Sequence, residues 1–376
     1  MGWREVEGAF SDAVARRVFP GAAVVVRRGA QVVFEGAFGF RTLLPRRCEM
    51  KIDTVFDLAS LTKVLATTIA VMMLMREERI RLDDRVTRFI PNFSLHGKER
   101  ITIRRLLAHC AGLAAWRPFF ERIREVERGG KVNFMATPRA KHWIYEEICR
   151  EKLEVATGTQ SIYSDLNFIV LGQVVEHIAG GSLDRFCHQR VYRPLGLEAT
   201  GFIDLAHARS HKLQPVHDMF AATEDCATRN RILIGEVDDE NAYAMGGVAG
   251  HAGLFAPVRE VDRIAAALTD CFHGRSDFVA PEIIREFWTR DATVSGSTWA
   301  LGWDTPSPMH SSSGHHFSPA AVGHLGFTGT SLWIDPGREI AVTILTNRVH
   351  PSRDNQAIRE FRPQIHDLIM EAIDGA

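Results

Sequence analysis

Strand-like runs lie at both ends of this 376-residue chain, and the long segment between them has the pattern of helices. Near the amino terminus, residues 22–26 and 31–38 are rich in β-branched and aromatic side chains and flank a short turn. Near the carboxyl terminus, residues 323–334 and 339–347 have the same character and are divided by the turn at 335–338. Strands from the two ends of a chain can pair in one antiparallel sheet, whereas βαβ units would alternate strands and helices throughout. We therefore predict an α+β fold.

This distribution also predicts two lobes. Residues 1–75 and 291–376 form the expected sheet lobe, in which amphipathic helices at 3–18 and from about 359 to 373 flank the strands. Residues 76–290 form the expected inserted lobe, which is mainly helical. A ligand site is expected in the cleft between two such lobes.

The composition is that of an ordinary water-soluble protein, with 45% hydrophobic and 24% charged residues. The formal net charge of −1 provides no global field that would attract nucleic acid or an anionic membrane surface, so we expect neither as a partner. The first residues lack the apolar core of a signal sequence, and the longest apolar run, 64–75, is shorter than the roughly 20 residues of a membrane span. These features predict a cytoplasmic protein.

Metal-binding patterns are weak in this sequence. Six cysteines are scattered without a C-x-x-C pair, which favours reduced, packed cysteines over a disulfide framework or a zinc site. His310, His315 and His316 have no H-E-x-x-H partner and are interpreted as a solvated loop. The acidic segment 238–241 lacks the pattern of a calcium loop. We expect neither a metal ion nor another cofactor.

Ser60 and Lys63 form an S-x-x-K tetrad at the start of a helical run, 61–76. Residues three apart on a helix share a face, so the Lys63 amine can lie beside the Ser60 hydroxyl. The helix dipole favours negative charge on that oxygen, and a partly desolvated lysine can be the base that a serine nucleophile needs. Taken alone, such a tetrad is more often a serine helix cap followed by a surface lysine, so it needs support from elsewhere in the chain.

Tyr163, Ser164 and Asp165 precede an apolar helical run at 168–178. A phenol beside a lysine can have a lowered pKa and can pass a proton to a leaving group. The alternative is a tyrosine at a helix entrance, with Ser164 or Asp165 as the helix cap.

His324, Leu325 and Gly326 begin a third motif, which continues through Phe327 into the strand-like run. Glycine in a strand lets the backbone approach a ligand closely. An edge strand beside a nucleophile can offer a backbone N–H to an oxyanion and can pair with an extended acyl group. His324 would then place a hydrogen-bond donor near the substrate; the alternative is a solvent-facing strand histidine.

In this order, the three motifs resemble those of the class C β-lactamase and penicillin-binding serine hydrolase family, which has a related S-x-x-K signature. The resemblance covers nearly the whole chain and implies a β-lactamase/transpeptidase-like fold and a covalent acyl-enzyme. The further segments that carry it are F-D-L-A at 56–59, L-D-D at 82–84 with Pro91, I-T-I-R-R-L-L-A-H at 101–109, A-G-L at 111–113, Y-R-P-L-G-L at 192–197, G-G-V-A-G-H-A-G-L at 246–254 and the strand pair at 324–336.

The resemblance also implies roles for individual residues. Ser60 would be the nucleophile, and Lys63 and Tyr163 would be its base and acid pair. The backbone N–H groups of Ser60 and Phe327 would form the oxyanion hole, with Gly326 in the same substrate-binding strand. His324 stands where class C β-lactamases carry the lysine of K-T-G, which is similar to soluble D,D-peptidases, D-aminopeptidases and some esterases.

Two residues depart from the β-lactamase pattern, and both disfavour β-lactam hydrolysis. Asp165 stands where relatives often carry an asparagine that hydrogen-bonds the acyl amide of the substrate; a carboxylate cannot donate, and it places negative charge near Lys63. His324 is mostly neutral near pH 7, so the anchor for the carboxylate of a β-lactam is weakened. We therefore expect a carboxylesterase or a β-lactamase-related hydrolase of small ester or amide substrates.

Other functions stay open at this point. The fold also serves D,D-carboxypeptidases and β-lactamases, which act on D-alanyl peptides or β-lactams, and fold alone does not choose among them. A slow penicillin-binding sensor or scaffold protein is the alternative outside catalysis, although an intact set of Ser60, Lys63 and Tyr163 argues against it. A metallohydrolase is a more distant alternative.

Three other features have simpler interpretations. His251, in the glycine-rich segment 246–253, is interpreted as a loop-packing residue. By resemblance, the acidic segment 238–241 lies near the cleft and shapes substrate access. Trp299 and Trp303 are expected to pack beside the active-site sheet, and whether they line the acyl pocket is left open.

Overall fold

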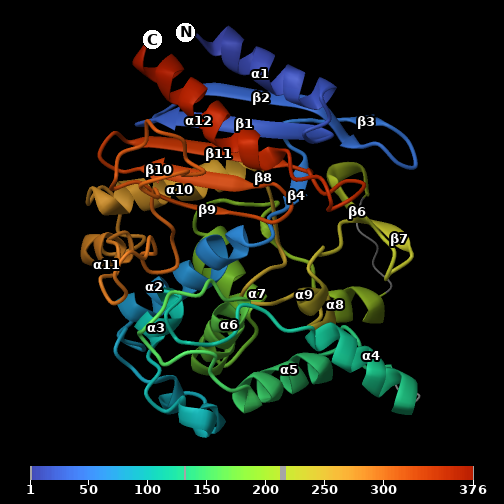
Figure 1. The fold of residues 1–376 in the computed structure, drawn as a ribbon, viewed down its shortest axis with the longest axis vertical. Helices are drawn as coiled ribbons and strands as arrows, with labels where there is room; N and C mark the ends of the chain where they lie inside the picture. Colours follow the sequence, from blue (N-terminus) through green and yellow to red (C-terminus); the bar gives the residue numbers. More distant parts are fainter. Residues whose placement is uncertain (1, 131–132, 212–216, 376) are drawn as a thin grey trace.

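The computed structural model describes residues 2–130, 133–211 and 217–375, and within them the central element is a six-stranded antiparallel sheet (Figure 1). The strand order is β3-β2-β1-β11-β10-β9, so strands from the two ends of the chain meet in the middle. The predicted α+β class and the pairing of the terminal strands are confirmed. The strands are β1 (Gly21–Arg28), β2 (Gln31–Thr42), β3 (Cys48–Glu49), β9 (Val322–Leu325), β10 (Ser331–Asp335) and β11 (Ile340–Thr346).

β1 and β11 lie at the centre because both of their faces are apolar. Successive side chains of a strand point to opposite faces of the sheet. Val24 of β1 and Val342 of β11 therefore belong to one core, whereas Val25 and Leu345 belong to the core on the opposite side. All seven residues of β11 are buried, as expected for a strand that is covered on both faces.

Helices cover both faces of this sheet. α1 (Trp3–Ala15) and α12 (Ile358–Asp374) contact each other and lie above the sheet at the top of Figure 1. α10 (Val258–Phe272) contacts β1 and β11 from the opposite face. The helices predicted at the two ends of the chain are confirmed.

The run predicted at 323–334 is not one strand. β9 and β10 form an antiparallel hairpin, in which His324 pairs with Leu332, and the loop between them holds two glycines. Gly329 adopts a φ of 108°, which strongly favours glycine, and Gly326 N donates to Thr330 O at 2.8 Å across the turn. β9 is the edge strand of the sheet, so the β9–β10 loop lies at that edge.

Helices predominate in the middle of the chain, with short strands among them. Two small sheets of the described residues have the strand orders β4-β8-β5 and β6-β7, and β4 comes from the amino-terminal segment. The predicted division into 1–75 with 291–376 and 76–290 stays a prediction. One helix of the segment 76–290, α10, contacts the central sheet. The elements are β4 (Val55–Asp57), α3 (Ile103–Leu107), α4 (Phe119–Gly130), α5 (Pro138–Arg150), α6 (Asp165–Ala179), α7 (Leu183–Cys187), β5 (Gly201–Phe202), α8 (Leu205–Ser210), β6 (Ala222–Cys226), β7 (Arg231–Ile234), α9 (Glu240–Ala244), β8 (Leu254–Pro257) and α11 (Pro281–Phe287).

The helix expected at 61–76 is not a uniform α-helix. It contains a π-helical segment, Lys63–Thr68, and continues as α2 (Ile69–Arg76). Every side chain of the π-helical segment is buried, and such segments often mark functional sites. No single described helix is long and apolar enough to cross a membrane; α6 meets that test only together with the helical segment that ends at Tyr192, across a bend of 71°.

Candidate active site

Ser60 lies in a tight turn between β4 and the helix that follows it. The preceding residue, Ala59, has a φ of 46°, a conformation that costs free energy in a residue with a Cβ. The Asp57 carboxylate holds the turn by accepting a hydrogen bond of 2.9 Å from Ala59 N. Thr330, in the β9–β10 loop, donates to Leu58 O at 3.0 Å and so ties the turn to the sheet.

Lys63 lies beneath Ser60 with its side chain fully buried. Its Nζ donates to Ser60 Oγ at 2.9 Å and to the backbone oxygen of His251 at 3.0 Å. It also forms an ion pair of 2.7 Å with Asp165 Oδ1. The alternative of a helix cap followed by a surface lysine is therefore wrong.

The charge of Lys63 is set by two opposing effects. Burial disfavours the ammonium, but the Asp165 carboxylate and Tyr163 together raise the pKa of Lys63 above its ordinary value. In the resting site Lys63 is therefore an ammonium paired with Asp165.

Tyr163 enters the cleft from the segment before α6. Ser164 caps the helix by accepting from Asn167 N at 3.3 Å, so this part of the capping alternative is confirmed. Ser164 N in turn donates to Nδ1 of the buried His109 at 3.0 Å. The Tyr163 ring stacks on Trp299 at 5.4 Å between ring centroids. Tyr163 thus caps nothing itself and faces the cavity that contains Ser60.

The expected lowering of the Tyr163 pKa is wrong. Burial raises the pKa of this phenol and the Asp165 charge raises it further, while Lys63 and the hydrogen bond with Ser60 act in the opposite direction. The phenol is therefore protonated near neutral pH, which suits a proton donor rather than a base.

His324 is 3% exposed, so the solvent-facing alternative is wrong. Its Nδ1 lies 2.8 Å from the backbone oxygen of Leu325, and because a carbonyl can only accept, Nδ1 carries the proton. Burial and the Lys63 charge lower the pKa of His324 to about 3, so the ring is neutral as predicted. Its Nε2 therefore carries a lone pair and can accept a hydrogen bond. His324 was expected to donate to the substrate, and this expectation is wrong.

The loop after β9 places a backbone N–H beside the nucleophile. Thr328 Oγ1 donates to the backbone oxygen of Asp57 at 2.8 Å, which holds the loop against the Ser60 turn. In the part of the chain that the structure describes, neither Ser60 N nor Phe327 N donates to a protein acceptor. Both residues line the two cavities of the cleft, so the N–H pair suits an oxyanion.

Two cavities meet at Ser60, Tyr163 and Phe327. The larger has a volume of about 510 Å³, and the smaller has a volume of about 290 Å³. The larger is bordered by His324, Trp299, Asp304, Arg348, Arg359 and Arg362. The smaller is bordered by Trp116, Asp165, Asp238, Asp239, Glu240 and Arg353. The cleft therefore has a basic chamber and an acidic chamber on either side of the nucleophile.

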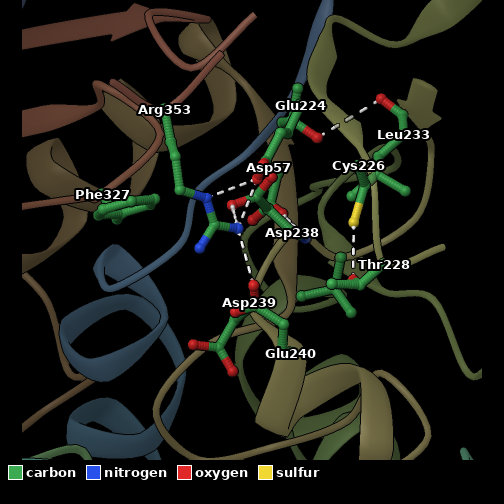
Figure 2. Close-up of polar contacts among 12 residues, drawn as sticks. Asp57, Glu224, Cys226, Thr228, Leu233, Asp238, Asp239, Glu240, Phe327 and Arg353 are labelled. Atoms are coloured by element: carbon green, nitrogen blue, oxygen red, sulfur yellow. Dashed lines mark hydrogen bonds and ion pairs between the residues drawn. The ribbon is translucent and has the colours of Figure 1, made fainter. Parts of the chain in front are cut away.

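Arg353 organises the acidic chamber, as Figure 2 shows. Its guanidinium pairs with Glu224 at 2.5 Å and with Glu240 at 2.8 Å, and it lies 3.9 Å from Asp238. The same guanidinium lies over the exposed Phe327 ring, 5.5 Å from its centroid. Burial raises the pKa of Asp238 to about 7, with the Asp57 charge as a second cause.

Asp239 and His251 form a second pair in this chamber. His251 Nε2 lies 2.9 Å from Asp239 Oδ1, and although burial opposes it, His251 lowers the pKa of Asp239. His251 is 1% exposed, which agrees with its interpretation as a packing residue. Ligand atoms of Asp165, Asp239 and His251 lie within 4.8 Å of one another, as a metal site would require. The Lys63 ammonium already contacts Asp165, however, and its charge opposes a metal cation there.

Several residues of the cleft were not assigned a role from sequence. His109 packs against Trp299, with 4.4 Å between ring centroids, although it appeared only as the last letter of a family segment. Arg348, Arg359 and Arg362 follow β11 or lie on α12, and no motif marks them. Trp299 lines the larger cavity and Trp303 is fully buried, and an acyl-pocket role for Trp299 stays a prediction.

The comparisons with known proteins agree with this geometry. A family model described as Beta-lactamase matches residues 6–366. An N-acetylmuramyl-L-alanine amidase of Bacillus subtilis is 31% identical over 352 residues, which are 88% of this chain and 78% of that protein. A putative D-alanyl-D-alanine carboxypeptidase of Escherichia coli is 31% identical over 360 residues, which are 90% of this chain and 81% of that protein.

Solved structures show the same fold. EstCE1, a hydrolase with promiscuous acyltransferase activity, superposes with a TM-score of 0.71 at 22% identity, over 96% of this chain and 98% of that one. The octameric penicillin-binding protein homologue from Pyrococcus abyssi superposes with a TM-score of 0.74 at 19% identity, over 99% of this chain and 78% of that one.

Proposed function

The chain belongs to the β-lactamase family, whose members are serine hydrolases, and we propose that it forms a covalent acyl-enzyme on Ser60 and hydrolyses small esters or amides. The observation that carries the proposal is the hydrogen bond of 2.9 Å from the buried Lys63 amine to Ser60 Oγ at the junction of two cavities. A buried ammonium is costly to place beside a serine that has only a structural role.

In the proposed reaction, the Lys63 ammonium first gives up one proton, and Ser60 Oγ then attacks the substrate carbonyl as its own proton passes to the neutral amine of Lys63. The N–H groups of Ser60 and Phe327 stabilise the negative charge on the carbonyl oxygen. When the intermediate collapses, the bond to the leaving group breaks, and Tyr163 donates a proton to the departing atom and is reprotonated by Lys63. Water then hydrolyses the acyl-enzyme and restores the Ser60 hydroxyl.

Asp165 and His324 favour esters over β-lactams. A β-lactam presents an acyl amide and a carboxylate, whereas a simple ester presents only the reacting carbonyl. Asp165 has no hydrogen to donate, and His324 turns a lone pair rather than a positive charge toward the cleft. A missing charge-assisted hydrogen bond costs about 1.5–3 kcal/mol, or roughly ten- to a hundredfold in rate.

The test is a turnover panel of p-nitrophenyl butyrate, nitrocefin and a D-alanyl peptide. The wild type should have a higher kcat/KM for the ester than for nitrocefin, and Ser60→Ala should lose turnover of both. The double variant Asp165→Asn with His324→Lys should raise the ratio of kcat/KM for nitrocefin to kcat/KM for the ester by at least about tenfold, the effect of restoring one charge-assisted hydrogen bond. A wild type that prefers nitrocefin would refute the ester preference, and turnover that survives Ser60→Ala would refute the acyl-enzyme on Ser60.

A second candidate is hydrolysis of an amide whose leaving group carries a carboxylate. The observation that favours it is the wall of Arg348, Arg359 and Arg362, which form no ion pair within the described segments. Burial and the two neighbouring arginines lower the pKa of Arg362 to about 10, as expected for positive charges that lack an anion. Both curated relatives are named for substrates that contain alanine, an amino acid with a carboxylate. These arginines would supply the charge that His324 lacks, and the β-lactam penalty would then rest on Asp165 alone.

Two peptides that differ only in the charge of the leaving group test this candidate. Arg359→Ala should raise KM for N-acetyl-D-alanyl-D-alanine and leave KM for its carboxyl-terminal amide unchanged. Arg263→Ala, on α10 and outside both cavities, is the matched control. Equal turnover of the two peptides by the wild type would reject a carboxylate-binding leaving-group site.

A further inference from the structure

Lys63 is held as an ammonium whose three N–H bonds are all in use. Its acceptors are Ser60 Oγ at 2.9 Å, the backbone oxygen of His251 at 3.0 Å and Asp165 Oδ1 at 2.7 Å. An ammonium has three donors and no acceptor. It can therefore take no proton from Ser60 until it has given one of its own away.

Only one of these three acceptors can keep that proton. Ser60 is the group that must be deprotonated, and a backbone carbonyl does not bind a proton near neutral pH. Asp165 Oδ1 belongs to a carboxylate, the one anionic acceptor of the three, and it lies closest to Nζ. Its side chain is 18% exposed at the N-terminus of α6, so Lys63 and Asp165 form a largely desolvated pair.

The other titratable groups around Lys63 are poorly suited to the task. The Tyr163 phenol, with its ring centroid 5.0 Å from Nζ, already carries its proton. Asp239 accepts from His251 and from the backbone N–H of Ala242. His109 and His324 are buried and neutral, and the Lys63 charge disfavours a second charge on either ring.

We propose that Asp165 is the internal proton acceptor that converts Lys63 from an ammonium into the base for Ser60. In the first step an N–H bond of Lys63 breaks and an O–H bond forms on Asp165. In the second step the O–H bond of Ser60 breaks as its oxygen attacks, and the proton joins the Lys63 amine. Once Tyr163 has protonated the leaving group, Lys63 reprotonates Tyr163 and Asp165 returns its proton to Lys63. The inference rests on the proposed acyl-enzyme function.

This arrangement has a distinctive dependence on pH. Because the proton moves within the site, the protein holds the same number of protons before and after the first step. The rate of Ser60 attack is then flat across neutral pH. If Lys63 instead lost its proton to solvent, the rate would rise about tenfold per pH unit up to the pKa of Lys63, which Asp165 and Tyr163 raise against the effect of burial.

The test measures the rate at which a fluorophosphonate labels Ser60, from about pH 5.5 to about pH 9.5, because this rate reports attack by Ser60 without deacylation. The wild type should show a plateau. Asp165→Asn, which is isosteric, should rise about tenfold per pH unit up to the pKa that Lys63 adopts without its counter-ion. Asp165→Glu, which keeps the carboxylate, should retain the plateau. Glu240→Gln removes a carboxylate from the same chamber without touching Lys63 and should also retain it.

A wild-type rate that climbs through neutral pH contradicts the inference, and so does an Asp165→Asn profile identical to that of the wild type. Circular dichroism checks that each variant is folded; if Asp165→Asn is not, the wild-type and Asp165→Glu profiles decide. Absence of labelling at Ser60 in the wild type is a different result, because it overturns the acyl-enzyme proposal and not the path of the proton.

Discussion

Replacing Gly326 by alanine tests whether the β9–β10 loop positions the oxyanion donor. A Cβ at this position would lie 2.0 Å from Thr330 Oγ1 and 2.6 Å from the backbone oxygen of Leu58. Neither atom is free to move, because Thr330 Oγ1 itself donates to Leu58 O at 3.0 Å. The loop that carries Phe327 N must therefore shift away from the Ser60 turn.

The size of the effect follows from these distances. Ordinary van der Waals contact begins at 3.4 Å, so the new Cβ would be about 0.8 Å too close to Leu58 O and about 1.4 Å too close to Thr330 Oγ1. A shift of about this size takes an oxyanion donor out of hydrogen-bonding range, and loss of one donor costs about 10²–10³ in kcat, or about 2.7–4 kcal/mol.

The assay is steady-state hydrolysis of p-nitrophenyl butyrate, with thermal unfolding measured on the same protein. Gly326→Ala should lose kcat by about 10²–10³ with little change in KM. Gly337→Ala, in the turn between β10 and β11, is the control, because its Cβ would come no closer than 3.7 Å to any neighbour. A folded Gly326→Ala protein with the kcat of the wild type would refute this account of the loop.

Three further predictions concern single side chains. Tyr163→Phe should lose about 10²–10⁴ in kcat at unchanged thermal stability, and near-wild-type turnover would return Tyr163 to a structural role. His109→Phe leaves the buried N–H of Ser164 without its acceptor and should lower the free energy of unfolding in urea by about 1–3 kcal/mol, whereas an unchanged midpoint would contradict that role. Because the pKa of Asp238 is raised from 3.8 to about 7, its neutral form stabilises the fold at low pH, and this contribution is lost as pH rises toward about 7. In urea unfolding, the Asp238→Asn variant should therefore become more stable relative to the wild type as pH rises from about 4 to about 7. A difference in free energy of unfolding that does not change with pH would contradict the raised pKa of Asp238.

The sequence allowed the fold and the centre of the site to be predicted because both follow from local patterns. Continuous runs of apolar and β-branched residues mark β1 and β11 as strands, and strands at opposite ends of a chain can pair in one antiparallel sheet. The spacing of Ser60 and Lys63 places two side chains on one helical face. Lys63 Nζ and Ser60 Oγ are 2.9 Å apart.

Other features depend on contacts between distant segments, which no local pattern records. The run at 323–334 was predicted as one strand-like segment, whereas the positive φ of Gly329 and the hydrogen bond from Thr330 to Leu58 O divide it into a hairpin. The direction of the Tyr163 pKa depends first on burial, which the motif does not show, although the charge of Asp165, which the motif does show, acts in the same direction. His324 is an acceptor only because Leu325 O faces its Nδ1.

The basic chamber shows the same limit on a larger scale. Arg348, Arg359 and Arg362 are separated by short stretches of chain and have no spacing typical of a binding motif. They face Ser60 because α12 crosses the sheet beside the end of β11. That they form no ion pair with any described residue is a property of the folded cleft alone.

The most direct test of the acyl-enzyme is the mass of the protein after reaction with a fluorophosphonate. We expect one equivalent of the phosphonyl group to be added, and proteolysis with tandem mass spectrometry to place it on Ser60. Ser60→Ala should gain no mass under the same conditions. If the wild type is unlabelled, or if the Ser60→Ala protein is labelled to the same extent, Ser60 is not the nucleophile and the proposed acyl-enzyme mechanism is wrong.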